Sequence, residues 1–216
     1  ICYKGTMYEY EKFVYYMLNK PAGVVSATED KRDKTVVDLL KEAGRNDLFP
    51  MGRLDKDTEG LLILTNDGAL AHDLLSPAKH VEKVYECTLA APFDRIQKEK
   101  LEQGIDIGEK KLTMPAKVTI LGEKKIALTI LEGKFHQVKR MLSAVDCEVT
   151  YLKRIAIGQV ALDKELAPGN YRALTEDEKN KLEFNELFSR TVGRGLAPAA
   201  HFASGKMLCR KAQIMP

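Results

Sequence analysis

The chain has 216 residues, of which 44% are hydrophobic and 30% are charged, and its formal net charge is +3. This length fits one large domain or two small ones and allows a sizeable buried core. No run of 18 apolar residues occurs, so no membrane span is expected. The cysteines have neither CxxC nor zinc-ligand spacing, which favours free thiols in a cytoplasmic protein. They are Cys2, Cys87, Cys147 and Cys209.

The basic residues are concentrated at the C-terminal end. Residues 187–216 contain no acidic residue and five basic ones, which are Arg190, Arg194, Lys206, Arg210 and Lys211. Residues 1–186 are therefore slightly acidic, and nucleic-acid binding there would require local basic patches. We expect residues 189–216 to form a basic tail of unknown role, because such a tail is more often solvated than functional.

Strands and short helices are expected in the first half of the chain. The expected strands are residues 13–18 and 61–65, and the expected helices are residues 36–43 and 69–75. The first strand ends at Lys20-Pro21-Ala22-Gly23. Thr35 is a candidate N-cap and Gly44 a terminator for the first helix, and Pro77 ends the second.

The second half of the chain predicts further strands and helices. The expected strands are 84–89, 116–121, 125–131, 149–152 and 155–162, and the expected helices are 92–103, 135–145 and 176–188. The helix at 135–145 has one apolar arc at 3.6 residues per turn, which we expect to pack in the core. The arc consists of Phe135, Val138, Met141, Leu142 and Val145. Because strands and helices do not alternate strictly, an α+β fold with a mixed, largely antiparallel sheet is predicted.

The segment Gly52-Arg53-Leu54-Asp55 places an arginine and a carboxylate just before the apolar run 61–65. A carboxylate held on such a rigid element, with cations nearby, suits a nucleophile or a proton-transferring base. The turn signal Thr65-Asn66-Asp67-Gly68 closes the far end of the strand. Asp55 is therefore the first candidate for a catalytic residue.

Two further segments could serve this carboxylate. On the helix at 135–145, His136, Lys139 and Arg140 lie beside the apolar arc, and Lys139 could reach across a cleft to a carboxylate. A solvated polar helix face is the plainer interpretation of these residues alone. Lys83 and Tyr85 point to the same face of a strand, where an aromatic ring beside a cation suits stacking on a nucleobase, although a lone tyrosine in a strand is usually core.

A calcium-binding loop is the competing interpretation of the acidic segment. Asp55, Asp57, Glu59 and Gly60 match the first, third, fifth and sixth positions of an EF-hand loop. The twelfth position is Asn66 instead of the bidentate glutamate, and residues 61–65 are expected to form a strand. The histidines show no metal-ligand spacing, and no dinucleotide or ATP motif occurs. No metal site is therefore predicted.

Five segments, taken in order, carry a resemblance to a known family. They are Lys20-Pro21-Ala22-Gly23, Gly52-Arg53-Leu54-Asp55, Leu61-Leu62-Ile63-Leu64-Thr65-Asn66-Asp67-Gly68, Lys83-Val84-Tyr85 and Glu132-Gly133-Lys134-Phe135-His136-Gln137-Val138-Lys139-Arg140-Met141. Together they resemble the pseudouridine synthases of the RsuA/RluB/RluE/RluF family. The resemblance implies that family's catalytic fold over residues 11–188, with flanking helices and a central cleft. It also implies isomerisation of an RNA uridine to pseudouridine without a metal or an organic cofactor.

The resemblance also implies roles for single residues. Asp55 aligns with the catalytic aspartate, Tyr85 with the tyrosine that stacks on the target base, and Lys139 with the basic residue that pairs with the aspartate. Arg53 resembles the arginine that holds the place of the flipped nucleotide. The other implied RNA contacts are Lys20, Lys83, His136, Gln137 and Arg140. Attack of the carboxylate on the sugar and deprotonation of the sugar both remain open.

The segment from Phe135 to Met141 is closer to the 16S rRNA enzymes of the family, since the large-subunit enzymes tend to have arginine at the position of Lys139. This implies uridine 516 of 16S rRNA as the target, and 16S rRNA or a small-subunit assembly intermediate as the partner of a monomeric enzyme. A 23S rRNA synthase and a non-catalytic rRNA-binding assembly factor are the alternatives. Residues 1–10 resemble the remnant of an N-terminal alpha-L RNA-binding domain or a linker, and residues 189–216 match no family pattern.

Overall fold

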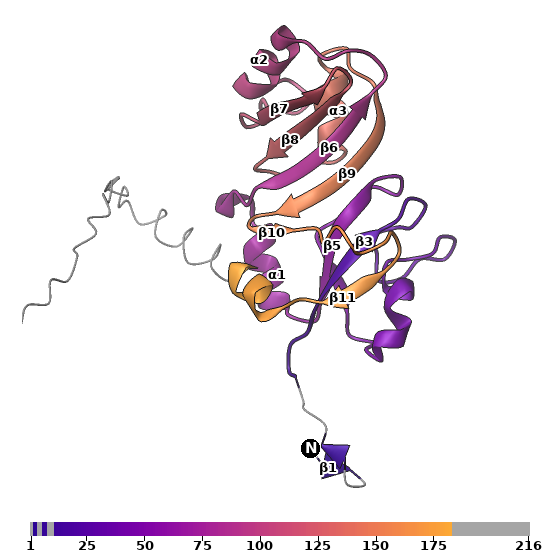
Figure 1. Cartoon of the computed structure of the whole chain (residues 1–216). Coiled ribbons are helices and arrows are strands. Elements are labelled where there is room, and N and C mark those ends of the chain that lie inside the picture. Colours follow the sequence, from indigo (N-terminus) through magenta and orange to yellow (C-terminus); the bar gives the residue numbers. More distant parts are fainter. Residues whose placement is uncertain (1, 4–5, 8–10, 183–216) are drawn as a thin grey trace, which may run out of the picture.

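The computed structural model describes residues 2–3, 6–7 and 11–182, and its main feature is one mixed sheet (Figure 1). The nine strands of this sheet are β3 (Tyr15–Lys20), β4 (Phe49–Met51), β5 (Glu59–Thr65), β6 (Lys83–Leu89), β7 (Lys117–Gly122), β8 (Lys125–Ile130), β9 (Val149–Ile157), β10 (Val160–Ala161) and β11 (Tyr171–Ala173). Their order is β11-β3-β5-β9-β6-β8-β7, with β4 beside β5 and β10 beside β9. Two more short strands, β1 (Cys2–Tyr3) and β2 (Thr6–Met7), pair with each other.

Helices accompany both parts of this sheet. They are η1 (Val37–Ala43), α1 (Gly68–Leu75), η2 (Pro77–Lys79), α2 (Arg95–Gln103), α3 (Gln137–Ser143) and a helix at 176–182. Figure 1 shows α2 and α3 with the part of the sheet that contains β6 to β9, and α1 with the part that contains β3, β5 and β11. None of the helices in the described ranges has the length and apolar character needed to cross a membrane.

The two parts of the sheet meet at a short parallel pairing between β5 and β9. Only Glu59 with Lys153 and Gly60 with Arg154 are in register there, whereas the other strand pairs of the sheet are antiparallel. Gly60 has φ +103°, and a Cβ atom at this position would lie 2.2 Å from the backbone oxygen of Arg154. Only glycine therefore permits the two strands to approach this closely.

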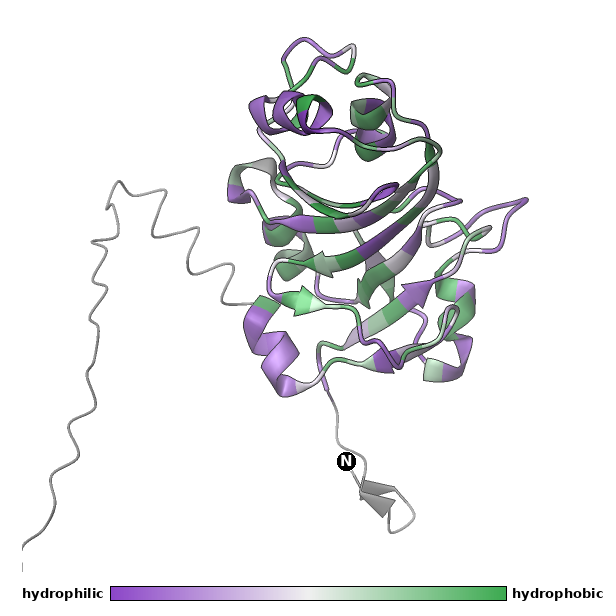
Figure 2. Cartoon of the chain, turned by 45° about the horizontal axis from the view of Figure 1, so that its top comes forward, coloured by the Kyte–Doolittle hydropathy of each residue, from purple (hydrophilic) through white to green (hydrophobic). Residues whose placement is uncertain are grey.

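Both faces of the sheet are covered, which explains the continuous apolar run in β5. Leu61, Leu62, Ile63 and Leu64 are all 0% exposed. Because side chains alternate along a strand, Leu62 and Leu64 pack in one hydrophobic cluster and Leu61 and Ile63 in the other. Figure 2 shows hydrophobic residues gathered along the central strands. The acidic group that precedes this strand is thus attached to one of the most buried elements of the fold.

The predicted α+β class and mixed, largely antiparallel sheet are confirmed. The predicted strand at 61–65 is part of β5, and the predicted helix at 69–75 is part of α1. Asp67 caps α1, because its carboxylate accepts hydrogen bonds from the backbone N–H groups of Ala69 and Leu70, both at 3.1 Å. The predicted N-cap at Thr35 is wrong, because the N-cap of η1 is Val36, which makes no side-chain capping bond; the Thr35 hydroxyl nevertheless accepts from the N–H of Asp38 at 3.2 Å.

Several predicted boundaries are wrong. The helix predicted from Pro92 begins at Arg95, because Asp94 forms a capping box with Gln97. The strands predicted at 149–152 and 155–162 are one strand, β9, followed by the short β10. The short strands β4 and β11 were not predicted. The last helix was predicted over residues 176–188, and its described part, 176–182, is helical. Residues 183–188 and the predicted tail at 189–216 lie outside the described residues.

Candidate active site

A cavity of about 620 Å³ lies where the two parts of the sheet meet. Two groups of residues form most of its polar lining. The loop side comprises residues 51–56, Thr58 and residues 132–138, and the strand side comprises Lys83, Tyr85, Leu152, Arg154 and Ile157. Arg53, Phe135 and His136 on the loop side are exposed, whereas Tyr85 and Arg154 on the strand side are 8% and 2% exposed. The strand side is therefore the enclosed side of the cavity.

A buried lysine fixes the loop that carries Asp55. Lys20 is 0% exposed, and its ammonium donates hydrogen bonds to the backbone oxygens of Pro21, Lys56 and Thr58 at 3.0, 3.2 and 2.9 Å. Desolvation lowers the pKa of Lys20 to about 8. The prediction that Lys20 contacts RNA is therefore wrong, because its three donors hold the loop.

A second contact fixes the backbone next to Asp55. The hydroxyl of Ser26 donates to the oxygen of Leu54 at 2.9 Å and accepts from the N–H of the same residue at 3.1 Å. The N–H of Thr58 donates to the oxygen of Asp55 at 3.1 Å and closes the turn. A carboxylate on such a braced turn keeps one position in the cavity.

A histidine and a lysine lie against the carboxylate of Asp55. His136 Nε2 is 3.4 Å from Oδ1, and Lys139 Nζ is 3.6 Å from Oδ2. The structure thus brings Asp55 and Lys139 together, as the sequence predicts. Lys139 is nevertheless closer to Asp57, at 2.6 and 2.7 Å from its two oxygens. This hydrogen bond lowers the pKa of Asp57.

Asp57 is a residue that the sequence suggested only as part of a calcium loop. Glu59 and Gly60, which matched later positions of that loop, belong to β5, and the Glu59 carboxylate accepts from the hydroxyl of Tyr151 at 2.7 Å. Within residues 11–182, no three acidic, histidine or cysteine side chains gather in a group that could hold a metal ion.

The predicted helix at 135–145 begins later because His136 is in the left-handed region, with φ +48°. α3 therefore begins at Gln137. Phe135 is not in the core arc as predicted, because it is 72% exposed and stacked on the His136 ring, with ring centroids 3.8 Å apart. Gln137 is only 4% exposed, accepts from the N–H of Lys134 and donates to Glu132. Its amide therefore orders the turn before α3, and because Gln137 also lines the cavity, its RNA contact stays a prediction.

Tyr85 and Lys83 both line the cavity from β6, as predicted from strand alternation. Lys83 Nζ donates to the oxygen of Val81 at 3.1 Å. Desolvation, followed by the repulsion of Arg154, lowers the pKa of Lys83 to about 8. Arg154 lies next to Tyr85 in the strand pairing and was not predicted as a site residue, since it falls between two expected strands.

Of the two remaining residues predicted to contact RNA, Arg53 lies in the cavity and Arg140 does not. Arg53 lines the cavity and is exposed. Arg140 is not in the cavity lining, because its guanidinium binds Glu109 at 2.9 Å and the backbone oxygens of Phe135 and Ile107. It joins α3 to the loop before β7.

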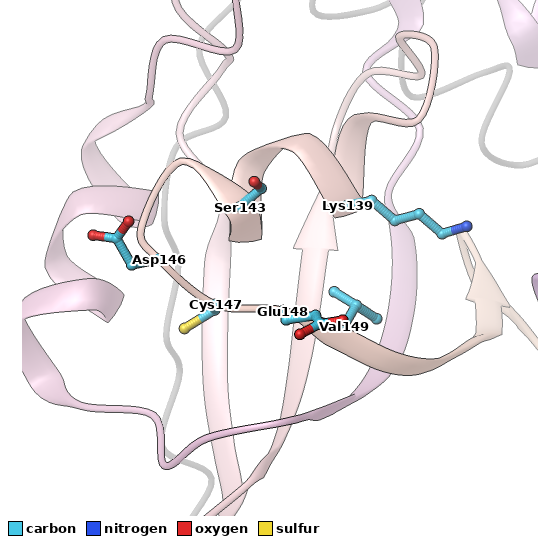
Figure 3. Close-up of a pocket in the computed structure, with 6 residues that line it drawn as sticks. All are labelled: Lys139, Ser143, Asp146, Cys147, Glu148 and Val149. Atoms are coloured by element: carbon cyan, nitrogen blue, oxygen red, sulfur yellow. The ribbon is translucent and has the colours of Figure 1, made fainter.

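A separate open hollow of about 480 Å³ lies beside α3. Figure 3 shows the Lys139 side chain extending away from Asp146 and Cys147, which also line it. The Cys147 thiol is buried, and its desolvation raises its pKa, so the reactive thiolate is disfavoured. The chemical groups that could act together are therefore those of the larger cavity.

Comparison with known proteins agrees with this geometry. The family model for RNA pseudouridylate synthase matches residues 14–144. An uncharacterized RNA pseudouridine synthase of Bacillus subtilis is 55% identical over 82% of this chain and 77% of its own length. The ribosomal small subunit pseudouridine synthase A of Vibrio cholerae is 46% identical over 76% and 71%. A crystal structure of a pseudouridylate synthase superposes with a TM-score of 0.76 and 43% identity over 80% of this chain and 75% of that one.

Proposed function

The chain belongs to the RNA pseudouridylate synthase family, and we propose that it converts uridine 516 of 16S ribosomal RNA to pseudouridine, with Asp55 as the catalytic carboxylate. Relatives at 44–46% identity are named as ribosomal small subunit synthases, which supports the small-subunit substrate. The likeness of residues 135–141 to the 16S enzymes supports the same target.

The reaction requires the base to leave the sugar and return by a different atom. The N1–C1′ bond breaks, the uracil turns, a C5–C1′ bond forms, the proton on C5 is lost, and N1 gains a proton. The nucleotide must first leave the RNA stack, which costs a few kcal/mol. Asp55 either attacks C1′ or removes a proton from the sugar, and it can accept the C5 proton at the end. Neither route needs an oxidant or a reductant.

The cavity supplies a place for each part of the flipped nucleotide. Asp55 lies on the loop side with His136 and Lys139 against its carboxylate, where the sugar would have to reach. Tyr85 lies on the enclosed side and can stack on the base. Arg53, which is exposed, can occupy the space that the flipped nucleotide leaves in the RNA. The buried strand side, with Tyr85 and Arg154, shields the detached base from water on that side.

The observation that carries the proposal is the placement of Asp55 on a braced turn, beside His136 and Lys139, in the lining of the cavity that also contains Tyr85. The test is to map pseudouridine in 16S rRNA, 23S rRNA and small-subunit assembly intermediates after incubation with the protein. We expect modification of the 16S substrates and a loss of about 10²–10⁴-fold or more in Asp55→Asn.

Three results would contradict the proposal in different ways. Modification confined to 23S rRNA would identify the large subunit as the target. An Asp55→Asn variant with full activity would remove the assigned role of the carboxylate. Binding of rRNA by the wild type without any pseudouridine formation would favour a ribosome-assembly factor.

A further inference from the structure

Most charges around the cavity already have a partner of opposite sign. Asp55 has His136 and Lys139, and Lys56 has Asp33 at 2.7 Å. The carboxylate of Glu132 lies 3.4 Å from the ammonium of Lys134 and also accepts from the amide of Gln137. Arg53 is exposed, so water can solvate its charge. The charges of these groups are therefore compensated by neighbouring charges or by water, without a ligand.

Lys83 and Arg154 are different. In the part of the chain that the structure describes, neither forms an ion pair with a carboxylate. Arg154 is 2% exposed; its Nε donates to the oxygen of Leu61 at 2.8 Å, but its Nη2 is buried without a hydrogen-bond partner. Lys83 is half-buried, and its one hydrogen bond is to a backbone oxygen.

These two cations are also close to each other. They project from paired strands, because β6 and β9 are in register at Tyr85 and Arg154, two residues from Lys83. Arg154 repels the ammonium of Lys83 strongly enough to contribute to its lowered pKa. Both line the same cavity as Asp55.

Two like charges without an anion are costly in an enclosed place. A buried cation without a counter-ion loses its hydration and gains no compensating attraction. Such an arrangement is favourable only when a ligand brings negative charge to it. Perturbed, unbalanced groups of this kind are concentrated at functional sites.

We infer that Lys83 and Arg154 bind the uracil in the anionic state that exists between its detachment from C1′ and its reattachment. This inference rests on the proposed isomerisation. When the N1–C1′ bond breaks, its electron pair stays with the base and spreads over N1, O2 and O4. When C5 attacks C1′, the pair forms the new bond; the C5 proton is then lost to the carboxylate of Asp55, and N1 takes up a proton. The negative charge on the base exists only between these two steps.

The two cations would act in different ways. Lys83 is the accessible one and donates to a carbonyl oxygen of the uracil, so it would be the catalytic residue. The Nη2 atom of Arg154 is enclosed, so Arg154 acts through its positive potential and by holding β9 to β5 through the oxygen of Leu61. Donors that are fixed where charge develops stabilise the transition state more than the ground state.

A backbone phosphate is the other anion that RNA could bring. The position of the pair favours the base, because the exposed basic residues lie on the loop side and Lys83 lies beside the ring of Tyr85. A phosphate contact would contribute to RNA affinity and to its salt dependence, whereas a contact with the detached base would contribute to the rate of bond cleavage. The two roles are therefore separable by experiment.

The experiment compares Lys83→Met, Lys83→Arg and the control Lys117→Met, which removes an exposed lysine of β7. Single-turnover pseudouridine formation and RNA affinity are measured for each with the rRNA that the wild type modifies. For Lys83→Met we expect a rate about 10²-fold lower, with RNA affinity changed less than about threefold and an unchanged salt dependence. Lys83→Arg should recover at least about tenfold of that loss, because it restores the charge.

A 5-fluorouridine substrate supplies the decisive readout, and its reaction is followed as single-turnover consumption of the 5-fluorouridine, because C5 then has no proton to lose and no pseudouridine forms. Fluorine stabilises the uracil anion, so cleavage of its N1–C1′ bond should depend less on Lys83, and the deficit of Lys83→Met should shrink by about tenfold or more. An equal deficit with both bases, or a loss of affinity with an unchanged rate, would overturn the inference and indicate positioning or phosphate contact. A Lys83→Met rate equal to wild type would also overturn it. Failure of the wild type on every rRNA would instead refute the proposed function.

Discussion

The loop side and the strand side of the cavity handle charge in opposite ways. On the loop side, Asp55 and Asp57 share Lys139, and the buried Lys20 beneath them donates to three backbone oxygens. On the strand side, Lys83 and Arg154 form no ion pair with a carboxylate within the described ranges, and each donates to a backbone oxygen. Charges that are balanced hold a structure in place, whereas charges that are unbalanced prepare a site for a ligand.

This difference predicts opposite stability effects for the two sides. Removing one member of a balanced buried set leaves its partners unsatisfied and destabilises the protein. Removing an unbalanced buried cation relieves a cost and stabilises the free protein, while activity is lost. The variants below test whether this contrast is real, from the largest expected effect to the smallest.

Replacing Gly60 should disrupt the contact between the two sides. In Gly60→Ala, the new Cβ would lie 2.2 Å from the oxygen of Arg154, and φ +103° is strained for alanine. We expect a loss of about 3–5 kcal/mol in the free energy of unfolding, measured by urea denaturation, and a loss of activity with it.

The control for that variant is Gly68→Ala, at the start of α1. No atom lies within 4 Å of a Cβ built there, so we expect a change of about 1 kcal/mol or less, in the stabilising direction. A Gly60→Ala protein as stable as wild type would show that β5 and β9 can separate without cost, and that the two sides of the cavity are not rigidly joined.

Lys20 and Lys83 give the most direct test of the contrast. Lys20→Met leaves the oxygens of Pro21 and Thr58 without the ammonium donor, so we expect a destabilisation of about 1–3 kcal/mol. Lys83→Met should instead stabilise the RNA-free protein by about 1 kcal/mol, which raises the thermal midpoint by about 2–4 °C. Thermal unfolding of both variants at pH 7 measures the difference.

The pH dependence of the Lys83→Met effect follows from its pKa. Folding lowers the pKa of Lys83 from 10.5 to about 8, so the unfolded chain holds more protons between these values, and the wild type gains stability as the pH rises. The advantage of Lys83→Met should be complete below about pH 8 and fade towards pH 10.5. Destabilisation by both lysine variants at pH 7 would refute the contrast.

Much of the fold follows from patterns that are visible in the sequence. The run 61–65 predicts a strand because it is apolar, and it is buried because both faces of the sheet are covered. β9 was divided in two because Lys153 and Arg154 interrupt its apolar pattern, although one strand accommodates both. β11 has three residues and depends on pairing with β3, so no local pattern could identify it.

The roles of charged residues could be predicted from the sequence where these residues lie at the surface, but not where they are buried. Asp55 lines the cavity, and Lys139 lies against its carboxylate, as expected. Lys20 and Arg154 were misjudged because a lysine or arginine is almost always exposed unless paired. Their environments depend on backbone oxygens that the fold brings from distant segments. Such long-range contacts leave no periodic signal in the sequence.

The smallest effect is expected for the second carboxylate of the loop side. Asp57 is 73% exposed at its side chain and binds Lys139 at 2.6 Å, and exposed ion pairs contribute about 1 kcal/mol or less. We expect Asp57→Asn to cost no more than that at pH 7. Because pairing with Lys139 lowers the pKa of Asp57, the difference from wild type should fade as the pH falls below about 4, as urea denaturation at pH 7 and pH 3 can show.

The same substitution tests whether one carboxylate or two perform the chemistry. Without Asp57, Lys139 can turn fully to Asp55, and we expect pseudouridine formation to fall by less than about tenfold, far less than the loss for Asp55→Asn. Asp33→Asn is the matched control, because it removes another exposed ion pair of this loop, at 2.7 Å to Lys56, and it should leave the rate unchanged. A loss in Asp57→Asn as large as that in Asp55→Asn would mean that Lys139 must be held between the two carboxylates for the reaction to occur.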